Sequence, residues 1–447
     1  MDKSLRKIGF QKIWDSPQGG SKGVNVGITD TGAPNLSDTR FYDWIGDKPP
    51  APPWPSQPSK IKLQASTVPS ASGADGHGHG TMMHYMTILN PINWPAPVTE
   101  KMGGVYRAYA YSCKVLSDAG SGQYSWIIAG LKKLADETPV DVINVSLGGG
   151  VHDQAIDDAV EYCVNKGIVV CIANGNSGSN RSPFAACDRS LCCPGDSVTA
   201  VNVGGSCGGH ELGPDFKEYV QTWSSRPPSY DNRKPPDTAR QYVIAPGLNI
   251  ELPAHSGGTS GTSLATPHVT ASAAAIIWKI IQKHPELRRT RQIVEMVWAL
   301  LLKTTLSLGY DTSGNWTKEE AYCIQGYGRV QVDKAIDLVD GTEPPPGKYA
   351  VSEWHGQFTI IRPVDRKPSR IEGQFSRDLY LPEETVAWSG KLMDANTSVG
   401  LANRQVAWGY QNKNGTATTD TNGIMQIEFI EGTPAIYDMA IVFAGDP

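Results

Sequence analysis

The feature that most constrains the fold is an alternation of short apolar strands with helical segments through the first 340 residues. The strand-like runs are 24–30, 113–116, 141–147 and 168–174, and the helical ones are 124–137, 153–167, 263–283 and roughly 290–303. Such an alternation, with short β-branched runs as strands, predicts a mainly parallel sheet that is covered by helices on both faces. In α/β folds of this kind, ligands bind outside the carboxyl ends of the strands.

The composition changes near residue 340, where DGTEPPPGK has three consecutive prolines, as a semi-rigid linker would. Beyond it the helical periodicity ends, and short strand-like runs are separated by Asn, Gly and Thr turns. We therefore predict an α/β domain over 1–340, a Pro-rich linker over 341–348 and a small all-β sandwich over 349–447.

The overall composition argues against several classes of function. A formal net charge of −5 and a pI of about 6.0 give no electrostatic basis for binding nucleic acid. No apolar run approaches the roughly 18 residues that a membrane span needs. Residues 1–20 lack the apolar core of a secretion signal. Four of the eight cysteines lie within 187–207, which hints at disulfides and an oxidising compartment rather than a zinc ribbon.

Three serines crowd the stretch HSGGTSGTSLATPHV (255–269), just before a long and mostly apolar helical pattern. Glycine and serine clusters are typical of turns, and a serine before a helix is usually an N-cap, so the stretch alone is consistent with an ordinary loop. Ser263, however, opens the helix, with Pro267 close to the first turn. A hydroxyl at this place lies beside the positive end of the helix, which can stabilise a developing oxyanion.

Polar residues that follow other strands supply the remaining parts of a nucleophilic acyl-transfer site. Asp30 ends the strand 24–30, Asn176 follows the strand 168–174, and His79 opens a further helix in GHGHGT. In such a site the hydroxyl attacks, the imidazole takes its proton, and the carboxylate fixes the imidazole tautomer and stabilises its charged form.

Each of these residues also has an ordinary interpretation. The triplet DTG occurs in pepsin-like aspartic proteases, but these need two such carboxylates, and no second Asp-Thr/Ser-Gly is present. His77, His79 and His84 could together bind a metal ion. An asparagine after a strand is most often a turn residue. Each signal taken singly is weak.

Taken together, the motifs resemble those of the subtilisin-like serine proteases, the subtilases, over essentially all of residues 8–340. VGITDTG resembles their aspartate motif, GHGT their histidine motif and SGTSLATPHV their serine motif. NGNSG is similar to their oxyanion-asparagine motif, and QGYGRVQVDKA (325–335) is similar to the end of their catalytic domain. Several independent motifs in the family's order make the resemblance specific.

The resemblance implies a role for each matched residue. Ser263 would be the nucleophile, His79 the general base and Asp30 the residue that orients His79. Asn176 would donate its side-chain amide to the oxyanion, beside the backbone N–H of Ser263. The residues expected to flank an extended substrate and hydrogen-bond its backbone are Gly120, Ser121, Gly122, Ser146, Leu147 and Gly148. Ser256 and Ser260 remain loop residues.

The implied function is that of a secreted serine endopeptidase, which acts on protein or peptide substrates through an acyl-enzyme and needs no cofactor for its chemistry. An inhibitory prodomain, with which most subtilases fold, is not recognisable. Two alternatives stay open. One is a narrow processing protease, in which the Pro-rich stretch 47–60 restricts access and Asp75 favours a basic substrate residue. The other is an inactive homologue that binds peptides without cutting them.

The sequence also departs from the family pattern. Leu264 stands where subtilisins usually have Met, and Met82 follows HGT where another His is usual. NPINWPAPVTEKMGG (90–104) lacks a recognisable calcium loop, so no metal site is predicted there and a structural calcium ion stays an open alternative. The C-terminal strands, in SGKLMD, TATTDTNGIMQIEF and VFAGD, more loosely resemble bacterial and archaeal Ig-like repeats, which implies a spacer or a docking module.

Overall fold

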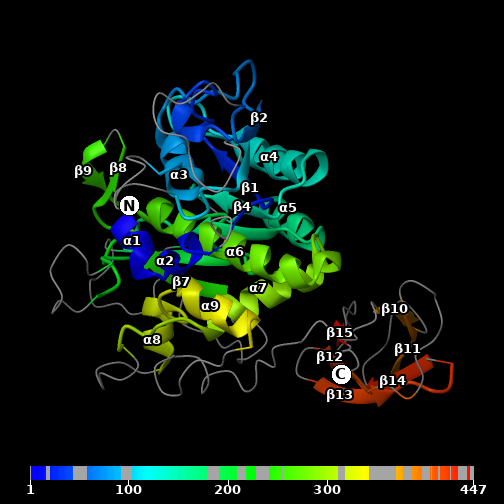
Figure 1. Ribbon diagram of the computed structural model, residues 1–447. Helices are drawn as coiled ribbons and strands as arrows, with labels where there is room; N and C mark the ends of the chain where they lie inside the picture. The colour runs from blue at the N-terminus through cyan, green and yellow to red at the C-terminus, as the bar shows by residue number, and fades with distance from the viewer. Residues whose placement is uncertain are drawn as a thin grey trace. The chain divides into compact units, whose positions relative to one another are not determined.

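The computed structural model divides the chain into two compact units, Met1–Ile360 and Ile361–Pro447 (Figure 1). The residues that it describes are 2–16, 21–43, 58–91, 103–150, 152–178, 191–208, 218–227, 241–253, 255–310, 318–341, 369–375, 385–394, 403, 405–410, 413–422, 424–430 and 440–442. Apart from residue 341, the predicted linker 341–348 lies outside these residues, as does most of the Pro-rich stretch 47–60.

The first unit is built on a parallel sheet, whose seven strands in the described part of the chain have the order β2-β3-β1-β4-β5-β6-β7. The strands are β1 (Asn25–Asp30), β2 (Ile61–Ser66), β3 (Tyr109–Lys114), β4 (Val142–Val145), β5 (Val169–Ala173), β6 (Val201–Ser206) and β7 (Gln241–Pro246). Every neighbouring pair runs parallel. The predicted α/β class is thereby confirmed.

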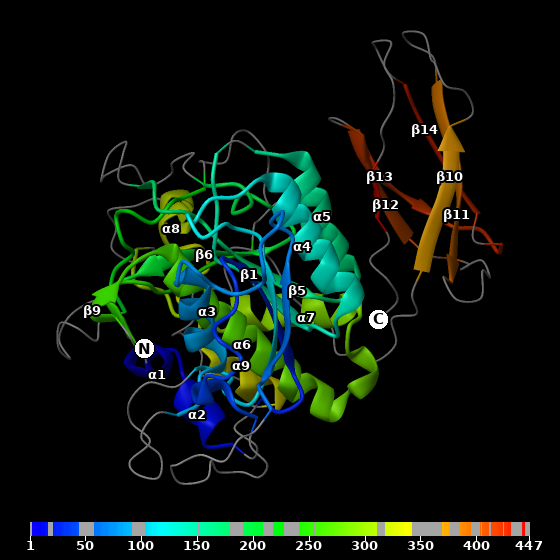
Figure 2. The same cartoon turned by 90° about the horizontal axis from the view of Figure 1, so that it is seen from above.

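Helices cover both faces of the sheet (Figure 2). The helices are α1 (Asp2–Lys7), α2 (Phe10–Trp14), α3 (His79–Ile88), α4 (Tyr124–Glu137), α5 (Gln154–Asn165), α6 (Thr262–Lys283), α7 (Arg291–Lys303), α8 (Lys318–Gln325) and α9 (Val332–Val339). α4 and α5 lie on one face, and α3, α6 and α9 lie on the other. A short antiparallel pair, β8 (Ile250–Leu252) and β9 (His255–Thr259), precedes α6.

Helix α6 is the central element of its face and packs against β4, β5, β6 and β7. Its alanines 271 and 273–275 are fully buried, and such small side chains let a helix approach a sheet closely. Among the described helices, α6 alone is long and apolar enough to cross a membrane, with a mean hydropathy of 1.3, but 89% of that window is buried as in a core helix. This helix is not one uninterrupted apolar run in the sequence, because polar Ser, Thr and His side chains interrupt it.

The predicted elements agree with the structure where their pattern is strongly periodic. α4 has the predicted bounds, and α6 begins one residue earlier than predicted. The predicted strand 113–116 was wrong in its start and end: β3 is Tyr109–Lys114, because its half-buried tyrosines conceal the apolar pattern. β6, rich in glycine and polar residues, was not predicted.

The carboxyl ends of β1, β4 and β5 bring three predicted site residues to one edge of the sheet. Asp30 is the last residue of β1, Ser146 directly follows β4, and Asn176 lies three residues beyond β5. Because these neighbouring strands are parallel, their ends meet at the same edge, where α/β folds bind ligands.

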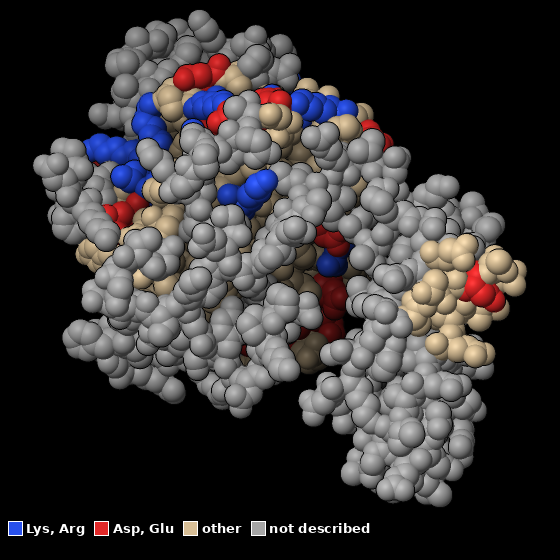
Figure 3. Space-filling model, turned by 90° about the horizontal axis from the view of Figure 1, so that it is seen from below, with Lys and Arg blue, Asp and Glu red and all other residues tan. Residues whose placement is uncertain are grey.

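The surface of the described residues carries charges of both signs. On the face shown in Figure 3, basic and acidic side chains alternate along one edge rather than forming a patch of one sign. This mixed surface agrees with the modest net charge of −5.

The second unit contains two antiparallel sheets of three strands in its described residues, with the orders β10-β11-β14 and β13-β12-β15. The strands are β10 (Ser369–Phe375), β11 (Thr385–Asp394), β12 (Gln405–Tyr410), β13 (Lys413–Thr418), β14 (Ile424–Ile430) and β15 (Ala440–Val442). Leu392 of β11 and Met425 of β14 are buried. The likeness to Ig-like repeats stays a prediction.

A buried lysine holds the end of α3, the helix that begins with His79. Lys60 Nζ donates to the carbonyl oxygens of Ile88 and Tyr106 and to Oδ1 of Asn90. Burial lowers the pKa of Lys60 well below its ordinary value, but three oxygen acceptors are the partners that an ammonium group needs. Lys60 therefore ties α3 to the segments that precede β2 and β3.

We predict that Lys60→Met lowers the free energy of unfolding by about 3 kcal/mol, because it leaves buried oxygen acceptors without a donor. Lys62→Met is the matched control. Lys62 is partly exposed, with its ammonium 3.3 Å from Asp43, and its loss should change stability by less than about 1 kcal/mol. Chemical denaturation of both variants measures the difference, and equal losses would contradict the role of Lys60.

Candidate active site

The centre of the site is a contact between a buried carboxylate and an imidazole. Asp30 is fully buried at the end of β1, and its Oδ1 lies 2.7 Å from His79 Nδ1. The same oxygen accepts a hydrogen bond from the backbone N–H of Thr31, also at 2.7 Å. A carboxylate at Nδ1 favours the tautomer with the proton on that nitrogen, so Nε2 is left able to accept a proton.

The electrostatic surroundings of His79 favour its protonated form. Burial by itself lowers the pKa of His79, but the charge of Asp30, their hydrogen bond and the charge of Asp75 together raise it above its ordinary value. The imidazole side chain is 21% exposed, so it is open to a bound molecule on one side and enclosed on the other.

Asp75 caps the start of α3. Its carboxylate accepts hydrogen bonds from the backbone N–H groups of His77, Gly78 and Thr81 and from the hydroxyls of Thr31 and Thr81. Partial burial would raise the pKa of Asp75, but these hydrogen bonds lower it. With both oxygens engaged, Asp75 fixes the helix that carries His79. The suggestion that it favours a basic substrate residue loses support.

Ser263 lies in the first turn of α6, where a proline shapes the backbone. Pro267 has no N–H to give to the carbonyl of Ser263, four residues earlier in the helix. The hydroxyl of Ser146 donates to that carbonyl instead, at 2.9 Å. Ser146 in turn accepts from Asn144 Nδ2, and Thr270 of α6 donates to Asn144 Oδ1. A hydrogen-bond chain therefore connects the end of β4 to the start of α6.

The side-chain amide of Asn176 is oriented by the first residue of α6. Its Oδ1 accepts from Thr262 N at 2.9 Å and from Thr262 Oγ1 at 3.0 Å, so the oxygen is fixed and Nδ2 is the donor that faces away. A Cβ atom at Gly261 would lie 3.1 Å from Ser263 Oγ and 3.3 Å from Asn176 Nδ2. The hydroxyl and the amide nitrogen therefore flank the same point, where glycine leaves space.

A cavity of about 920 Å³ connects these groups. Nine of the ten site residues predicted from the sequence line it, namely His79, Gly120, Ser121, Gly122, Ser146, Leu147, Gly148, Asn176 and Ser263. The tenth, Asp30, lies behind His79. The structure thus brings together residues that are up to 233 positions apart in the chain. Ser260, by contrast, directly follows β9 and accepts from the backbone N–H of Asn249, which directly precedes β8.

Cys192 forms part of the cavity wall, which the sequence analysis did not anticipate. A Cβ atom on Gly148 would meet its Sγ at 2.1 Å, so only glycine fits there. Burial raises the pKa of the Cys192 thiol to about 12, which keeps it protonated at neutral pH. Cys323 is disulfide-bonded, whereas Cys192 and Cys193 are free thiols, so the disulfides suggested for 187–207 do not include these two.

Thr262 also helps to shape the site, a contribution that its place within the serine motif does not reveal. Two residues before a helical apolar pattern, a threonine is commonly read as a cap. The partner that gives it a role, Asn176, lies 86 positions away, so no local pattern could indicate the contact. Most of the stretch 90–104, which lacks a recognisable calcium loop, lies outside the described residues, since these omit 92–102.

A parallel sheet with helices on both faces, which brings His79, Asn176 and Ser263 to one cavity with Asp30 behind His79, is the arrangement of the subtilisin-like class of α/β fold. The sequence pattern of the Subtilase family matches residues 21–328, and the chain belongs to this family.

Individual relatives agree with this assignment. Subtilisin E of Bacillus subtilis (strain 168) is 35% identical over 230 residues, which cover 50% of this chain and 51% of that protein. The subtilisin of Bacillus pumilus is 34% identical over 230 residues, 50% of this chain and 71% of its own. Serine protease AprX of Bacillus subtilis (strain 168) is 27% identical over 349 residues, 70% and 66% of the two chains. The chain thus spans about half the length of relatives such as subtilisin E.

We predict that Asp75→Asn lowers the pKa of His79, because it removes a negative charge that favours the imidazolium. In the unaltered protein that pKa should lie above the ordinary value of about 6.5. NMR titration of the His79 ring protons measures both values. Asp118→Asn, which removes an exposed carboxylate bound to Lys114, should leave the pKa unchanged. An equal shift in the two variants would contradict a specific effect of Asp75.

Proposed function

We propose that this protein is a serine endopeptidase in which Asp30, His79 and Ser263 form the catalytic triad. The observation that carries the proposal is the 2.7 Å contact between Asp30 and His79, in a cavity that Ser263 and Asn176 also line. The class of substrate follows from the same cavity, since two backbone segments, Gly120–Gly122 and Ser146–Gly148, line it and could hydrogen-bond an extended peptide between them.

In the first half of the reaction, Ser263 Oγ attacks the carbonyl carbon of the peptide while His79 Nε2 takes the hydroxyl proton. The negative charge that forms on the carbonyl oxygen is held by Asn176 Nδ2 and by the backbone N–H of Ser263. Ser263 is the second residue of α6, and its N–H is among the amides at a helix start that have no partner within the helix. Asp30 stabilises the imidazolium.

In the second half, the peptide C–N bond breaks and His79 returns its proton to the leaving amine, so that an acyl group stays on Ser263. A water molecule then gives a proton to His79 and attacks the acyl carbon, which forms a second tetrahedral intermediate. The bond from this carbon to Ser263 Oγ breaks, His79 returns the proton to Oγ, and the acid is released. Each step uses residues of this chain, and no cofactor is needed for the proton transfers.

The full set of reacting groups favours an active enzyme over a peptide-binding homologue without activity. A narrow processing role is the second candidate. Little supports it, because the Asp75 carboxylate already accepts hydrogen bonds from the start of α3. We propose a secreted location on the likeness to bacterial subtilisins, and a β-sandwich at 349–447 that acts as a spacer or docking module.

We predict that Ser263→Ala abolishes hydrolysis of a short peptide and labelling by an organophosphonate, because Oγ is the nucleophile. Ser260→Ala is the matched control, since its hydroxyl lies three residues before Ser263, accepts from the backbone N–H of Asn249 and is not among the described groups that line the cavity. It should retain both properties. Comparable labelling of the two variants would show that the nucleophile lies elsewhere.

The pH dependence follows from the pKa of His79. The imidazole must be neutral to accept the Ser263 proton, so kcat/KM should fall as pH drops through the pKa of His79. Because Asp30 and Asp75 raise this pKa, the midpoint of the fall should lie above about 6.5. A pH profile with a short peptide measures it, and a maximum near pH 4 would contradict this mechanism.

We predict that a chain ending at Asp340 cuts a short peptide with nearly unchanged kcat/KM. All proposed catalytic and substrate-binding residues lie before this point, and a unit of about a hundred residues can hold a core of its own. Kinetics of the truncated and full-length chains should be compared at a temperature at which both are folded. A loss of more than about tenfold would show that the second unit shapes the site.

A further inference from the structure

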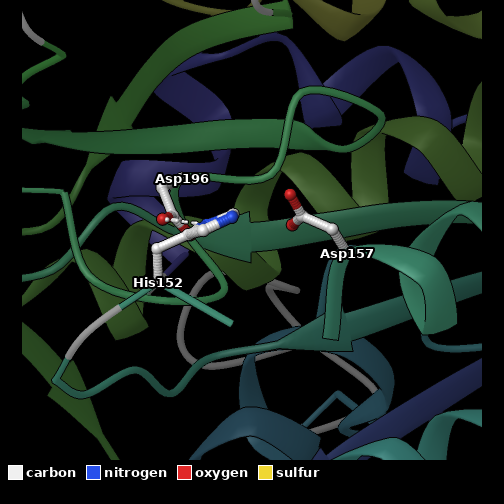
Figure 4. Close-up of side chains that lie close together, drawn as sticks. All are labelled: His152, Asp157 and Asp196. Atoms are coloured by element: carbon white, nitrogen blue, oxygen red, sulfur yellow. Dashed lines mark hydrogen bonds and ion pairs between the residues drawn. The ribbon is translucent and has the colours of Figure 1, made fainter. Parts of the chain in front are cut away.

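A cluster of metal-ligating side chains lies outside the catalytic residues. His152, Asp157 and Asp196 each place one ligand atom within 4.8 Å of the other two (Figure 4). His152 precedes α5, Asp157 belongs to its first turn, and Asp196 follows the segment that carries Cys192. In Figure 4 the carboxylate of Asp157 points toward the imidazole from the side opposite Asp196.

The geometry of the cluster is close to that of a metal site. His152 Nδ1 lies 2.9 Å from Asp196 Oδ2 in a hydrogen bond, whereas two ligands of a tetrahedral zinc ion with bonds of about 2.0–2.2 Å lie roughly 3.4 Å apart, so a small separation of the two groups would admit an ion. Asp157 offers the third ligand oxygen, within 4.8 Å of the other two ligand atoms. The His152 side chain is 51% exposed, so an ion can reach the cluster and keep a water molecule in an open position.

The surroundings are acidic, which favours a cation. Asp153, which follows His152 in the chain, lies at the start of α5. The negative charges of Asp196 and Asp153 both act on the side chain of Tyr124. Burial, the neighbouring Cys193 and these two carboxylates raise the pKa of Tyr124 to about 12. A divalent ion would offset this concentration of negative charge.

The cluster is connected to the wall of the active-site cavity. Gly149 and Cys193 exchange two backbone hydrogen bonds of 3.0 Å, so the segment after β4 is paired with the segment that carries Asp196. Gly148, Gly149, Gly150 and Cys192 of these two segments line the cavity. An ion held between His152 and Asp196 would therefore join the two segments a second time.

We propose that His152, Asp157 and Asp196 form a zinc site that stiffens this wall of the cavity. Zinc suits one imidazole and two carboxylates, whereas calcium prefers oxygen ligands alone. The zinc site uses none of the proposed catalytic residues. Its ligands lie in segments next to the proposed substrate-binding residues. Its effect on peptide cleavage rests on the proposed protease function, whereas its binding of zinc does not.

An ordinary interpretation of the same residues exists and defines the control. An exposed His–Asp ion pair is common on surfaces, and an acid in the first turn of a helix is favoured by the helix dipole. His284 and Glu286 form such a pair at 3.3 Å and belong to no cluster of three ligands among the described residues. A His284→Asn variant therefore removes a similar exposed imidazole but keeps all three proposed zinc ligands.

The test is calorimetric titration with zinc chloride of the full chain carrying Ser263→Ala, which prevents self-cleavage. We expect one equivalent to bind, and His152→Asn and Asp157→Asn each to weaken binding by at least about tenfold. His284→Asn should leave it unchanged. The proposal is overturned if no saturable binding occurs, or if zinc binds the His152 variant as tightly as the parent. It is also overturned if only His79→Asn abolishes binding, since the ion would then lie on the proposed catalytic imidazole.

Peptide kinetics then test the effect on the wall. With Ser263 intact, zinc should lower KM more than it changes kcat, relative to chelator-treated protein, and His152→Asn should remove this response. Equal responses of both proteins would contradict the coupling. A chain that binds zinc at this cluster but cleaves no peptide would disprove the protease function and leave the zinc site standing.

Discussion

The arrangement of the candidate site depends on how the first turn of α6 is held. Pro267 deprives the Ser263 carbonyl of its helical donor, and the Ser146 hydroxyl replaces that donor from the end of β4. Thr262, one residue earlier, fixes the amide of Asn176 from the end of β5. Ser263, the side-chain amide of Asn176 and the segment that begins at Ser146 are therefore positioned by hydrogen bonds to two consecutive residues. A change at this turn should disturb all three together.

The sheet supplies the other half of this arrangement. Asp30 ends β1, which pairs in parallel with β4, so its carboxylate lies at the same edge as Ser146. His79 comes from α3, whose start is capped by Asp75 and whose end is held by Lys60. Two charged groups with several partners, the half-buried Asp75 and the buried Lys60, thus hold α3 at both ends. This rigidity suits a mechanism that needs donors and acceptors already in place before the charge develops.

Much of this arrangement could be predicted from the sequence, for physical reasons that differ between residues. α4 and α6 were located from periodicity, since amphipathic or apolar patterns over several turns are strong signals. Asp30, His79, Asn176 and Ser263 were found through short motifs, and the cavity brings them together. β3 was misplaced because its tyrosines are half-buried, and the partner of Thr262 was invisible because it lies 86 residues away. The zinc cluster draws on residues up to 44 positions apart and matches no short motif.

The central claim is that Ser263 is the nucleophile and that Asn176 stabilises the oxyanion. A crystal structure of the protein after reaction with an organophosphonate tests both parts at once. The account predicts a phosphorus atom bonded to Ser263 Oγ, with a phosphoryl oxygen within about 3 Å of both Asn176 Nδ2 and the Ser263 backbone nitrogen. An adduct on another residue, or a phosphoryl oxygen directed away from Asn176, would contradict it.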